Sequence, residues 1–200
     1  SRSPAKSGMY GASPNSTMSP IEVIPAILAR TREDVHEAAE LVLPFALSAQ
    51  LDVVDGLFNS NLTWPYESAG TLSAGFDDLS LPTTSQLLWE VHLMTQKPQA
   101  LGEQFIAMGA KRIIAHIESL GNADIARSVF DVWHAAGAQV GISLLLDTPI
   151  SSIEDLIHDV EVVQVMSIAE IGVQGYTFDA RAVVRITELR NRYPHIVIAV

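Results

Sequence analysis

The chain has 200 residues, of which 48% are hydrophobic and 18% are charged, a balance typical of a globular protein with one large core. Its formal net charge of -11 argues against nucleic-acid binding, because a polyanion is bound by a basic surface. No cysteine occurs, so a disulfide framework and a thiolate metal site are excluded and a reducing cytoplasm is the expected location. No apolar run approaches the roughly 18 to 20 residues that span a bilayer, and no membrane partner is expected.

The first part of the chain differs in composition from the rest. Residues 1–20 are rich in Ser, Pro, Gly and Asn and show almost no apolar periodicity. We interpret residues 1–20 as a disordered tail or an added remnant. Residues 21–200 are expected to form one domain.

From Ile21 onward, short β-branched runs alternate with helical periodicity, and this alternation predicts repeated strand–helix units around a parallel sheet. Seven strands are expected, the last of them cut short by the end of the sequence. In chain order they are Glu22–Leu28, Ala46–Val54, Leu88–Met94, Arg112–His116, Gln139–Leu145, Glu161–Met166 and His195–Val200.

Helices are expected between these strands. Thr31 is positioned to cap the first one, with Asp34 completing a capping box. The buried faces expected for the first three helices are Val35, Ala38, Ala39 and Val42; Leu101, Phe105 and Met108; and Ile125, Val129, Val132 and Trp133.

Other residues mark where these segments begin and end. Gly109 and Gly137 are expected to end the second and third helices in the left-handed conformation. A fourth helix should follow Pro149 with Ser151 or Ser152 as its cap, and the last should span about Ala180–Asn191. Pro65–Pro82 is rich in Gly, Ser and Asp and is predicted to be an extended loop with at most a short helix.

Seven strand–helix units in about 180 residues favour a TIM (β/α)8 barrel over an open, doubly wound sheet. In a doubly wound sheet the first strand–helix turn is usually glycine-rich, whereas Ala29–Arg32 contains no glycine. Because a closed barrel needs an eighth strand, we expect an α/β barrel that is incomplete at its C-terminus.

Polar residues lie at the ends of two of the expected strands. Asp52 and His92 each stand near the carboxyl end of an apolar run, which is the edge where parallel α/β proteins bind their ligands. Asp55 directly precedes Gly56, and an Asx turn is its simplest role. Asp52 and His92 are therefore the leading candidates for a shared site.

Eight motifs in register on successive strand ends give the chain a resemblance to the ribulose-phosphate 3-epimerase family. They are Ile24-Pro25-Ala26-Ile27-Leu28-Ala29, Gln50-Leu51-Asp52-Val53-Val54-Asp55-Gly56, Asn61-Leu62-Thr63, Glu90-Val91-His92-Leu93-Met94, Gly109-Ala110, His116-Ile117-Glu118, Gly141 with Thr148-Pro149, and Val165-Met166-Ser167-Ile168. The resemblance implies a TIM barrel of the phosphate-binding type. It also implies the interconversion of ribulose 5-phosphate and xylulose 5-phosphate, with a divalent metal (Zn, Fe or Mn) as cofactor.

The resemblance assigns roles to individual positions. Asp52 matches the family's acid-base residue and a metal ligand, and His92 matches a metal-binding and substrate-binding histidine. The acid-base partner of Asp52 would follow Val200, where the family has Asp-Gly-Gly. The positions expected to contact substrate are His92, Met94, His116, Glu118, Met166, Gly172 and Gly175.

Several positions depart from the family pattern, among them Gln50 and Ala26. Gln50 stands where the family has a histidine ligand, and an amide oxygen binds zinc poorly compared with an imidazole. Ala26 stands where the family usually has a serine, which removes a polar group from the expected pocket. These changes imply weakened or altered use of a metal.

Two functional hypotheses follow. The first is an epimerase-like isomerase that removes the C3 proton of a ketose phosphate and forms an enediolate. The alternative is a catalytically impaired barrel that binds a sugar phosphate or a protein partner, which Gln50 and Ala26 favour. A small-molecule sugar phosphate is the expected ligand under either hypothesis, and self-association into a homo-oligomer is left open.

Overall fold

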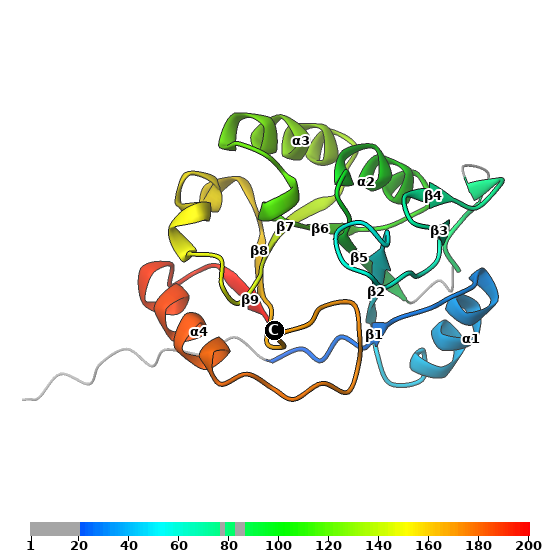
Figure 1. Cartoon of the computed structure of the whole chain (residues 1–200), viewed down its shortest axis with the longest axis horizontal. Coiled ribbons are helices and arrows are strands. Elements are labelled where there is room, and N and C mark those ends of the chain that lie inside the picture. The colour runs from blue at the N-terminus through cyan, green and yellow to red at the C-terminus, as the bar shows by residue number, and fades with distance from the viewer. Residues whose placement is uncertain (1–20, 77–78, 83–86) are drawn as a thin grey trace, which may run out of the picture.

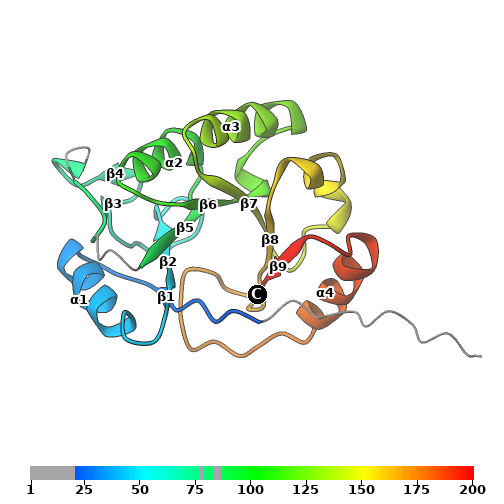
Figure 2. The same cartoon turned by 180° about the vertical axis from the view of Figure 1, so that it is seen from behind.

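The computed structural model of the chain describes residues 21–76, 79–82 and 87–200, so the predicted tail, residues 1–20, lies outside the described residues. The described residues form an α/β unit in which seven parallel strands curl into part of a barrel (Figure 1). The helices lie on the outer side of this curved sheet, and the view from behind shows the same arrangement (Figure 2). No described helix is long and apolar enough to cross a membrane.

The seven strands of the sheet pair in the order β1-β2-β5-β6-β7-β8-β9, and every pairing is parallel. This is the chain order of the seven predicted strands, so the predicted parallel α/β sheet is confirmed. The strands are β1 Ala26–Ile27, β2 Ser48–Val54, β5 Leu88–Met94, β6 Arg112–His116, β7 Gln139–Leu144, β8 Val162–Val165 and β9 Val197–Ala199.

The first strand is shorter than predicted. Only Ala26 and Ile27 pair with β2, whereas Glu22–Leu28 was expected. Ile21 and Val23 are 87% and 80% exposed, so the β-branched pattern at this end of the chain has no described layer to pack against. The prediction failed here because strand propensity is realised only where a partner surface covers the side chains.

The helices are α1 Arg32–Val42, α2 Pro98–Ala107, η2 Ile117–Ser119, α3 Ala123–Ala135, η3 Ile150–Asp159 and α4 Arg181–Arg192. The predicted capping box at Thr31 and Asp34 is confirmed, with both reciprocal hydrogen bonds present. Gly109 and Gly137 adopt φ of 110° and 89°, as predicted for residues that end helices in the left-handed conformation.

The buried face of α3 differs from the prediction. Val129 and Trp133 are buried, but Ile125 and Val132 are 53% and 39% exposed. The sheet is instead covered by Ala126, Val129, Phe130 and Trp133. The register was wrong because several positions around this helix are apolar, and only contact with the sheet and with α2 selects among them.

The segment after Pro149 is a 3-10 helix, and Pro149 itself rather than Ser151 or Ser152 precedes its first turn. The amide of Ser152 donates to the carbonyl of Pro149, which is the three-residue spacing of a 3-10 turn. Ile150, Ile153 and Leu156 recur every three residues and are all buried, so this period places them on one face.

A hairpin stands where an extended loop was predicted between Pro65 and Pro82. β3 Tyr66–Ser68 pairs antiparallel with β4 Thr71–Leu72. Gly70, at φ 70°, supplies the left-handed residue of the turn. Residues 77–78 of the predicted loop lie outside the described residues.

The two faces of the sheet carry different kinds of residue. On the outer face, alternate residues pack with the helices into the main core, among them Leu51, Val91 and Ile142, each 0% exposed. The intervening residues point into the curve of the sheet, and many of them are polar. The inner polar residues include Gln50, Asp52, Glu90, His92, Arg112, His116, Ser143 and Gln164.

Candidate active site

Asp52 and His92 lie side by side on the inner face of the sheet. β2 and β5 pair in parallel with Asp52 opposite His92, so both side chains leave the sheet in the same direction. The Oδ1 atom of Asp52 is 3.2 Å from Nδ1 of His92. His92 is 1% exposed, while the side chain of Asp52 is 15% exposed, so Asp52 is the more accessible member of the pair.

A chain of contacts continues from His92 to the next strand. Its Nε2 atom lies 2.9 Å from Nε2 of His116 at the end of β6. The two rings are 26° from coplanar with centroids 5.0 Å apart, which fits a hydrogen bond in the ring plane. Nδ1 of His116 lies 3.3 Å from Oε2 of Glu118, and Oε1 of Glu118 accepts hydrogen bonds from the amide of Leu145 and the hydroxyl of Thr148.

Burial determines the charge state at this end of the chain. His116 is 0% exposed, and this loss of solvation lowers its pKa to about 4, although Glu118 favours the charged ring. For Glu118, burial opposes ionisation, but the hydrogen bonds from His116 and Thr148 outweigh it and the pKa lies below its ordinary value. Near neutral pH the pair is therefore a neutral imidazole beside a carboxylate.

A second branch of contacts reaches His92 from β8. The amide nitrogen of Gln164, on β8, lies 3.2 Å from Nδ1 of His92. The amide nitrogen of Gln50 donates to Oε1 of Gln164 at 2.9 Å and to Oε1 of Glu90 at 2.7 Å. Glu90 is in turn paired with Arg112 at 2.7 Å. Four strands thus contribute to one connected polar network.

Apolar side chains surround this network at the carboxyl ends of β2 and β5. Val54, Met94 and Ile171 form a small buried cluster, with Met166 packed against it. Ile171 belongs to the segment between β8 and α4, which crosses the opening of the curved sheet in Figure 1. Met94 and Met166 therefore shape the wall of the site by packing.

The two glycines of this crossing segment have different surroundings. A Cβ atom on Gly172 would meet Nδ2 of Asn59 at 2.8 Å, so this glycine allows the segment to approach β2 closely. Gly175 has no neighbour within 4 Å of such an atom. Gln174, between them, donates to the backbone carbonyl of Ala26 at 3.2 Å.

Asp55 has the turn role that the sequence predicted. Its Oδ1 atom accepts from the amides of Leu57 and Phe58 at 2.8 and 2.7 Å, and its Oδ2 atom accepts from the amide of Gln96 at 2.8 Å. The carboxylate is 3% exposed. It holds the loop after β2 against the loop after β5 and takes no part in the Asp52 network.

The structure brings together the predicted residues Asp52, His92, His116 and Glu118, while the two glycines stand farther out on the crossing segment. The sequence analysis missed Glu90, Arg112 and Gln164. Glu90 and Arg112 lie two and four residues before His92 and His116 on the same strands, and Gln164 lies two residues before Met166, which directly follows β8. A two-residue periodicity drawn backward from those candidates would have found them.

The donor set does not fit the divalent metal that the sequence resemblance implied. Among the residues that the structure describes, no group of three or more His, Asp or Glu side chains could hold an ion. Gln50 turns its amide nitrogen to Glu90 and Gln164. Both ring nitrogens of His92 already face protein partners. These described side chains form a hydrogen-bonded network and do not present free ligands.

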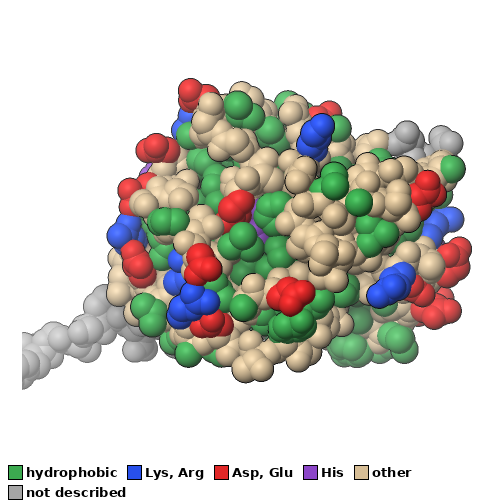
Figure 3. All heavy atoms as spheres, in the orientation of Figure 1, with side chains coloured by type: hydrophobic (Ala, Val, Ile, Leu, Met, Phe, Trp, Pro, Cys, Tyr) green, Lys and Arg blue, Asp and Glu red, His purple; other side chains and the backbone are tan. Residues whose placement is uncertain are grey.

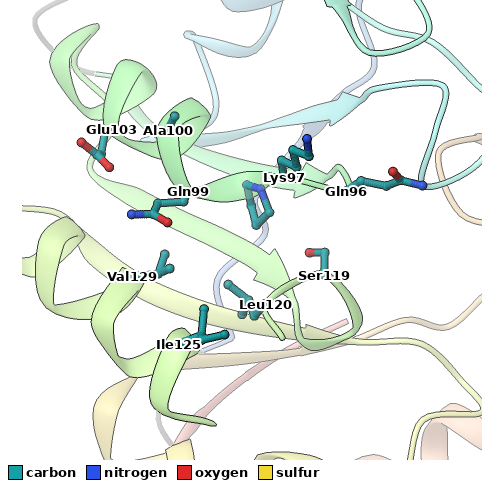
Figure 4. Close-up of a pocket in the computed structure, with 10 residues that line it drawn as sticks. Gln96, Lys97, Gln99, Ala100, Glu103, Ser119, Leu120, Ile125 and Val129 are labelled. Atoms are coloured by element: carbon teal, nitrogen blue, oxygen red, sulfur yellow. The ribbon is translucent and has the colours of Figure 1, made fainter. Parts of the chain in front are cut away.

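Two cavities lie near the site. One, of about 380 Å³, is outside the sheet between the start of α2 and the start of α3, and it includes none of the predicted site residues (Figure 4). The other, of about 320 Å³, lies between η2 and η3 and includes Glu118 and Thr148.

In the space-filling view, a histidine surface is visible near the centre of the face, between acidic and hydrophobic side chains (Figure 3).

Comparison with known proteins gives a consistent result. A sequence model described as the ribulose-phosphate 3-epimerase family matches residues 22–200. The chloroplastic ribulose-5-phosphate-3-epimerase of Arabidopsis thaliana is 32% identical over 174 residues, which cover 86% of this chain and 58% of that protein. The ribulose-phosphate 3-epimerase of Treponema pallidum (strain Nichols) is 33% identical over 118 residues, covering 59% of this chain and 49% of that protein. The chain spans about half the length of the curated relatives it matches.

Proposed function

The chain belongs to the ribulose-phosphate 3-epimerase family, and from this premise we propose that it acts as an isomerase on ketose phosphates. The proposed substrates are ribulose 5-phosphate and xylulose 5-phosphate, which differ in configuration at C3. The observation that carries the proposal is the placement of Asp52, a partly accessible carboxylate beside the buried His92, on the inner face of the sheet.

The proposed chemistry begins with Asp52 as the base. Its carboxylate takes the proton from C3, and the electrons of the broken C–H bond form the C2–C3 double bond of an enediolate, with the negative charge on the C2 oxygen. Returning a proton to the opposite face of C3 gives the epimer. The family resemblance assigns that step to an acid in an Asp-Gly-Gly segment after Val200. No step of this proposal passes through a metal.

The remaining predicted residues are proposed to hold the substrate. His116 and Glu118 would meet its hydroxyl groups at the rim of β6, since Glu118 also borders the cavity between η2 and η3. Met94 and Met166 would provide apolar walls. Gly172 and Gly175 are proposed to let the crossing segment approach the phosphate end of the substrate.

A second candidate function rests on a specific observation. The inner face is largely filled by its own hydrogen bonds, and Gln50 in particular is held by Glu90 and Gln164. A catalytically impaired barrel that retains the site for binding a sugar phosphate or a protein partner would have such an interior. The two candidates differ in whether a bound ketose phosphate exchanges its C3 proton.

Proton exchange tests the proposal directly. The protein is mixed with ribulose 5-phosphate in deuterium oxide, and loss of the C3 proton signal is followed by NMR with and without added divalent metal. We expect exchange in the native sequence and a loss of at least about 100-fold in Asp52→Asn, since a positioned base contributes on that order. Asp131→Asn, the same change on the exposed face of α3, is the matched control and should exchange normally.

Absence of exchange under every metal condition would refute the isomerase proposal. Binding of ribulose 5-phosphate without exchange, measured by calorimetry, would then support the binding function.

Several further expectations belong to this proposal. Residues 21–200 are proposed to be one domain, part of a TIM (β/α)8 barrel of the phosphate-binding type, preceded by a tail over residues 1–20. A sugar phosphate is the proposed partner, and nucleic acid is not expected because of the net charge of -11. A cytoplasmic location and a homo-oligomeric state remain predictions.

A further inference from the structure

Asp52 and His92 are spaced like two ligands of one metal ion. Their Oδ1 and Nδ1 atoms are 3.2 Å apart. Two ligand atoms at about 2.0–2.1 Å from one tetrahedral ion would be about 3.4 Å apart. Catalytic zinc sites typically have three protein ligands, so this pair needs at least one more. The residues around the pair therefore decide whether an ion can bind.

Gln50 stands where a third ligand would be expected, two residues before Asp52 on the same face of β2. Its amide nitrogen donates to Oε1 of Glu90 at 2.7 Å and to Oε1 of Gln164 at 2.9 Å. The other oxygen of Glu90 is paired with Arg112 at 2.7 Å. Gln50 thus supplies no imidazole or carboxylate, and both oxygens of Glu90 are already bonded.

The side chain of Gln164 lies in front of the ring nitrogen that an ion would use. Its Nε2 atom is 3.2 Å from Nδ1 of His92, the same atom that faces Asp52. A ring nitrogen has one direction of approach in the ring plane, so Asp52 and Gln164 share the space in front of it. An ion at about 2.0–2.1 Å from Nδ1 would lie in this space. Because an amide NH2 group only donates hydrogen bonds, Gln164 would have to move away.

Contacts from three other strands hold Gln164 in this orientation. Arg112 only donates, so the Glu90 carboxylate accepts from it and Gln50 turns its amide nitrogen toward Glu90. The same nitrogen donates to the oxygen of Gln164, which leaves the Gln164 nitrogen on the side of the site. Gln164 is 6% exposed, so moving it away would leave buried amide groups without partners, which is costly.

We propose that Gln164, oriented by Gln50, occupies the space in front of Asp52 and His92 and so prevents a divalent ion from binding there. The family resemblance has a histidine ligand at the position of Gln50. That change is matched by a partner across the curved sheet, because β2 and β8 are not neighbours in the strand order. The inference goes beyond the proposed function and does not depend on it, since it concerns ion binding and not proton exchange.

Titration with metal alone tests the native sequence. Zn²⁺ and Mn²⁺ are each titrated into the full chain without substrate, and heat is measured by calorimetry. The same titrations are made with Asp52→Asn, which keeps the shape of the side chain and removes its charge. Weak binding to surface carboxylates and histidines is common to both proteins. We expect the two isotherms to coincide for each metal, because no ion binds at Asp52.

Two variants test whether the amide of Gln164 keeps the ion out. Gln50→His places an imidazole beside Asp52, and adding Gln164→Leu removes the amide from His92. We expect the double variant to gain a Zn²⁺ site at least about 100-fold tighter than any in the native sequence, since even an outer partner of a metal ligand changes affinity by roughly 10–100-fold. Gln50→His alone keeps the amide and should bind Zn²⁺ more weakly than the double variant. Adding Asp52→Asn should abolish the new site.

A matched control places the new imidazole elsewhere. Gln139→His with Gln164→Leu makes the same two kinds of change, but residue 139 is at the start of β7, where its side chain accepts from Arg112. This protein should show the native Zn²⁺ isotherm.

Two results would overturn the inference: an Asp52-dependent site for either metal in the native sequence, or equal Zn²⁺ affinity in folded Gln50→His with and without Gln164→Leu. If the variants do not fold, the native comparison alone still decides. Exchange of the C3 proton together with an Asp52-dependent ion would refute only this inference. A protein with neither exchange nor such an ion would refute only the proposed function.

Discussion

The two faces of the same strands are built on different principles. On the outer face, side chains such as Leu51, Val91 and Ile142 are fully buried against helices and stabilise the fold by the area they remove from water. On the inner face, Asp52, His92 and their neighbours are also largely buried, but they are polar. Their burial is tolerated because most of these groups find a partner, and the hydroxyl of Ser143 is an exception among the described residues.

The difference shows where stability and chemistry reside in this molecule. An apolar contact is non-directional, so the outer face tolerates changes that preserve volume. A hydrogen-bond network is directional, so one replaced amide on the inner face can change the roles of several neighbours. We therefore expect outer substitutions to change the free energy of unfolding through lost packing, and inner substitutions to change it through lost hydrogen bonds and altered proton uptake, as four predictions specify.

The largest effect is expected for Trp133→Ala on the outer face. Trp133 is 0% exposed, covers Gly102 of α2 and donates from its indole to the carbonyl of Gln99. Removing this side chain should lower the free energy of unfolding by about 3–5 kcal/mol, measured by urea denaturation. Ile125→Ala, at a 53% exposed position of the same helix, should cost less than about 1 kcal/mol. Equal losses would contradict the assignment of the α3 face.

The next effect concerns pH and the inner face. The pKa of His116 falls from 6.5 to about 4 on folding, because burial disfavours the charged ring. Below pH 6.5 the unfolded chain takes up a proton that the folded chain refuses, so stability is fully present above pH 6.5 and declines down to about pH 4. The integrated loss is on the order of 3 kcal/mol.

Urea midpoints measured between pH 7 and pH 4 give this slope. His116→Gln should flatten it, whereas His158→Gln, at an exposed position of η3, should leave it unchanged. A slope that survives in His116→Gln would show that another group is responsible.

A smaller effect is expected for Arg112→Met. Arg112 is one-quarter exposed, but its partner Glu90 has a side chain only 7% exposed and would be left as a buried carboxylate with Gln50 alone. We expect a loss of about 2–3 kcal/mol in thermal or urea unfolding. Replacing both partners, in Arg112→Met with Glu90→Leu, should recover most of it. Failure of the double variant to recover would mean that the network itself contributes net stability.

The smallest effect is expected for Thr31→Ala, which removes a local determinant of the outer layer. Thr31 accepts from the amide of Asp34 and is solvent-exposed, so only the cap of α1 is lost. The expected cost is about 1 kcal/mol in urea unfolding. Thr31→Ser should restore most of it because the hydroxyl is retained. No change in either variant would indicate that α1 is fixed by packing alone.

Much of the outer architecture could be predicted from sequence because its signals are local. The order and direction of the strands follow from alternating strand and helix periods, and the cap at Thr31 and the turn at Asp55 depend on residues within three positions. Where several faces of a segment are apolar, as in α3, the local signal is ambiguous. Contact with the sheet then decides the buried face.

The candidate site was only partly readable. Asp52, His92, His116 and Glu118 could be named from their places near strand ends and from the family resemblance, and the structure places them in one chain of contacts. Strand periodicity could have placed Gln164 on the inner face, but its contact with Gln50 could not be read, because the two residues are 114 positions apart in the sequence.

The sequence by itself determined the parallel α/β sheet, the order of its strands and the family to which the chain belongs, because periodicity and strand-end motifs depend on residues that are close together in the sequence. Only the tertiary structure decided which polar side chains face one another inside the curve of the sheet. Hydrogen-bond roles depend on partners brought together from four distant strands, and the role of each partner is set by the next one along the network.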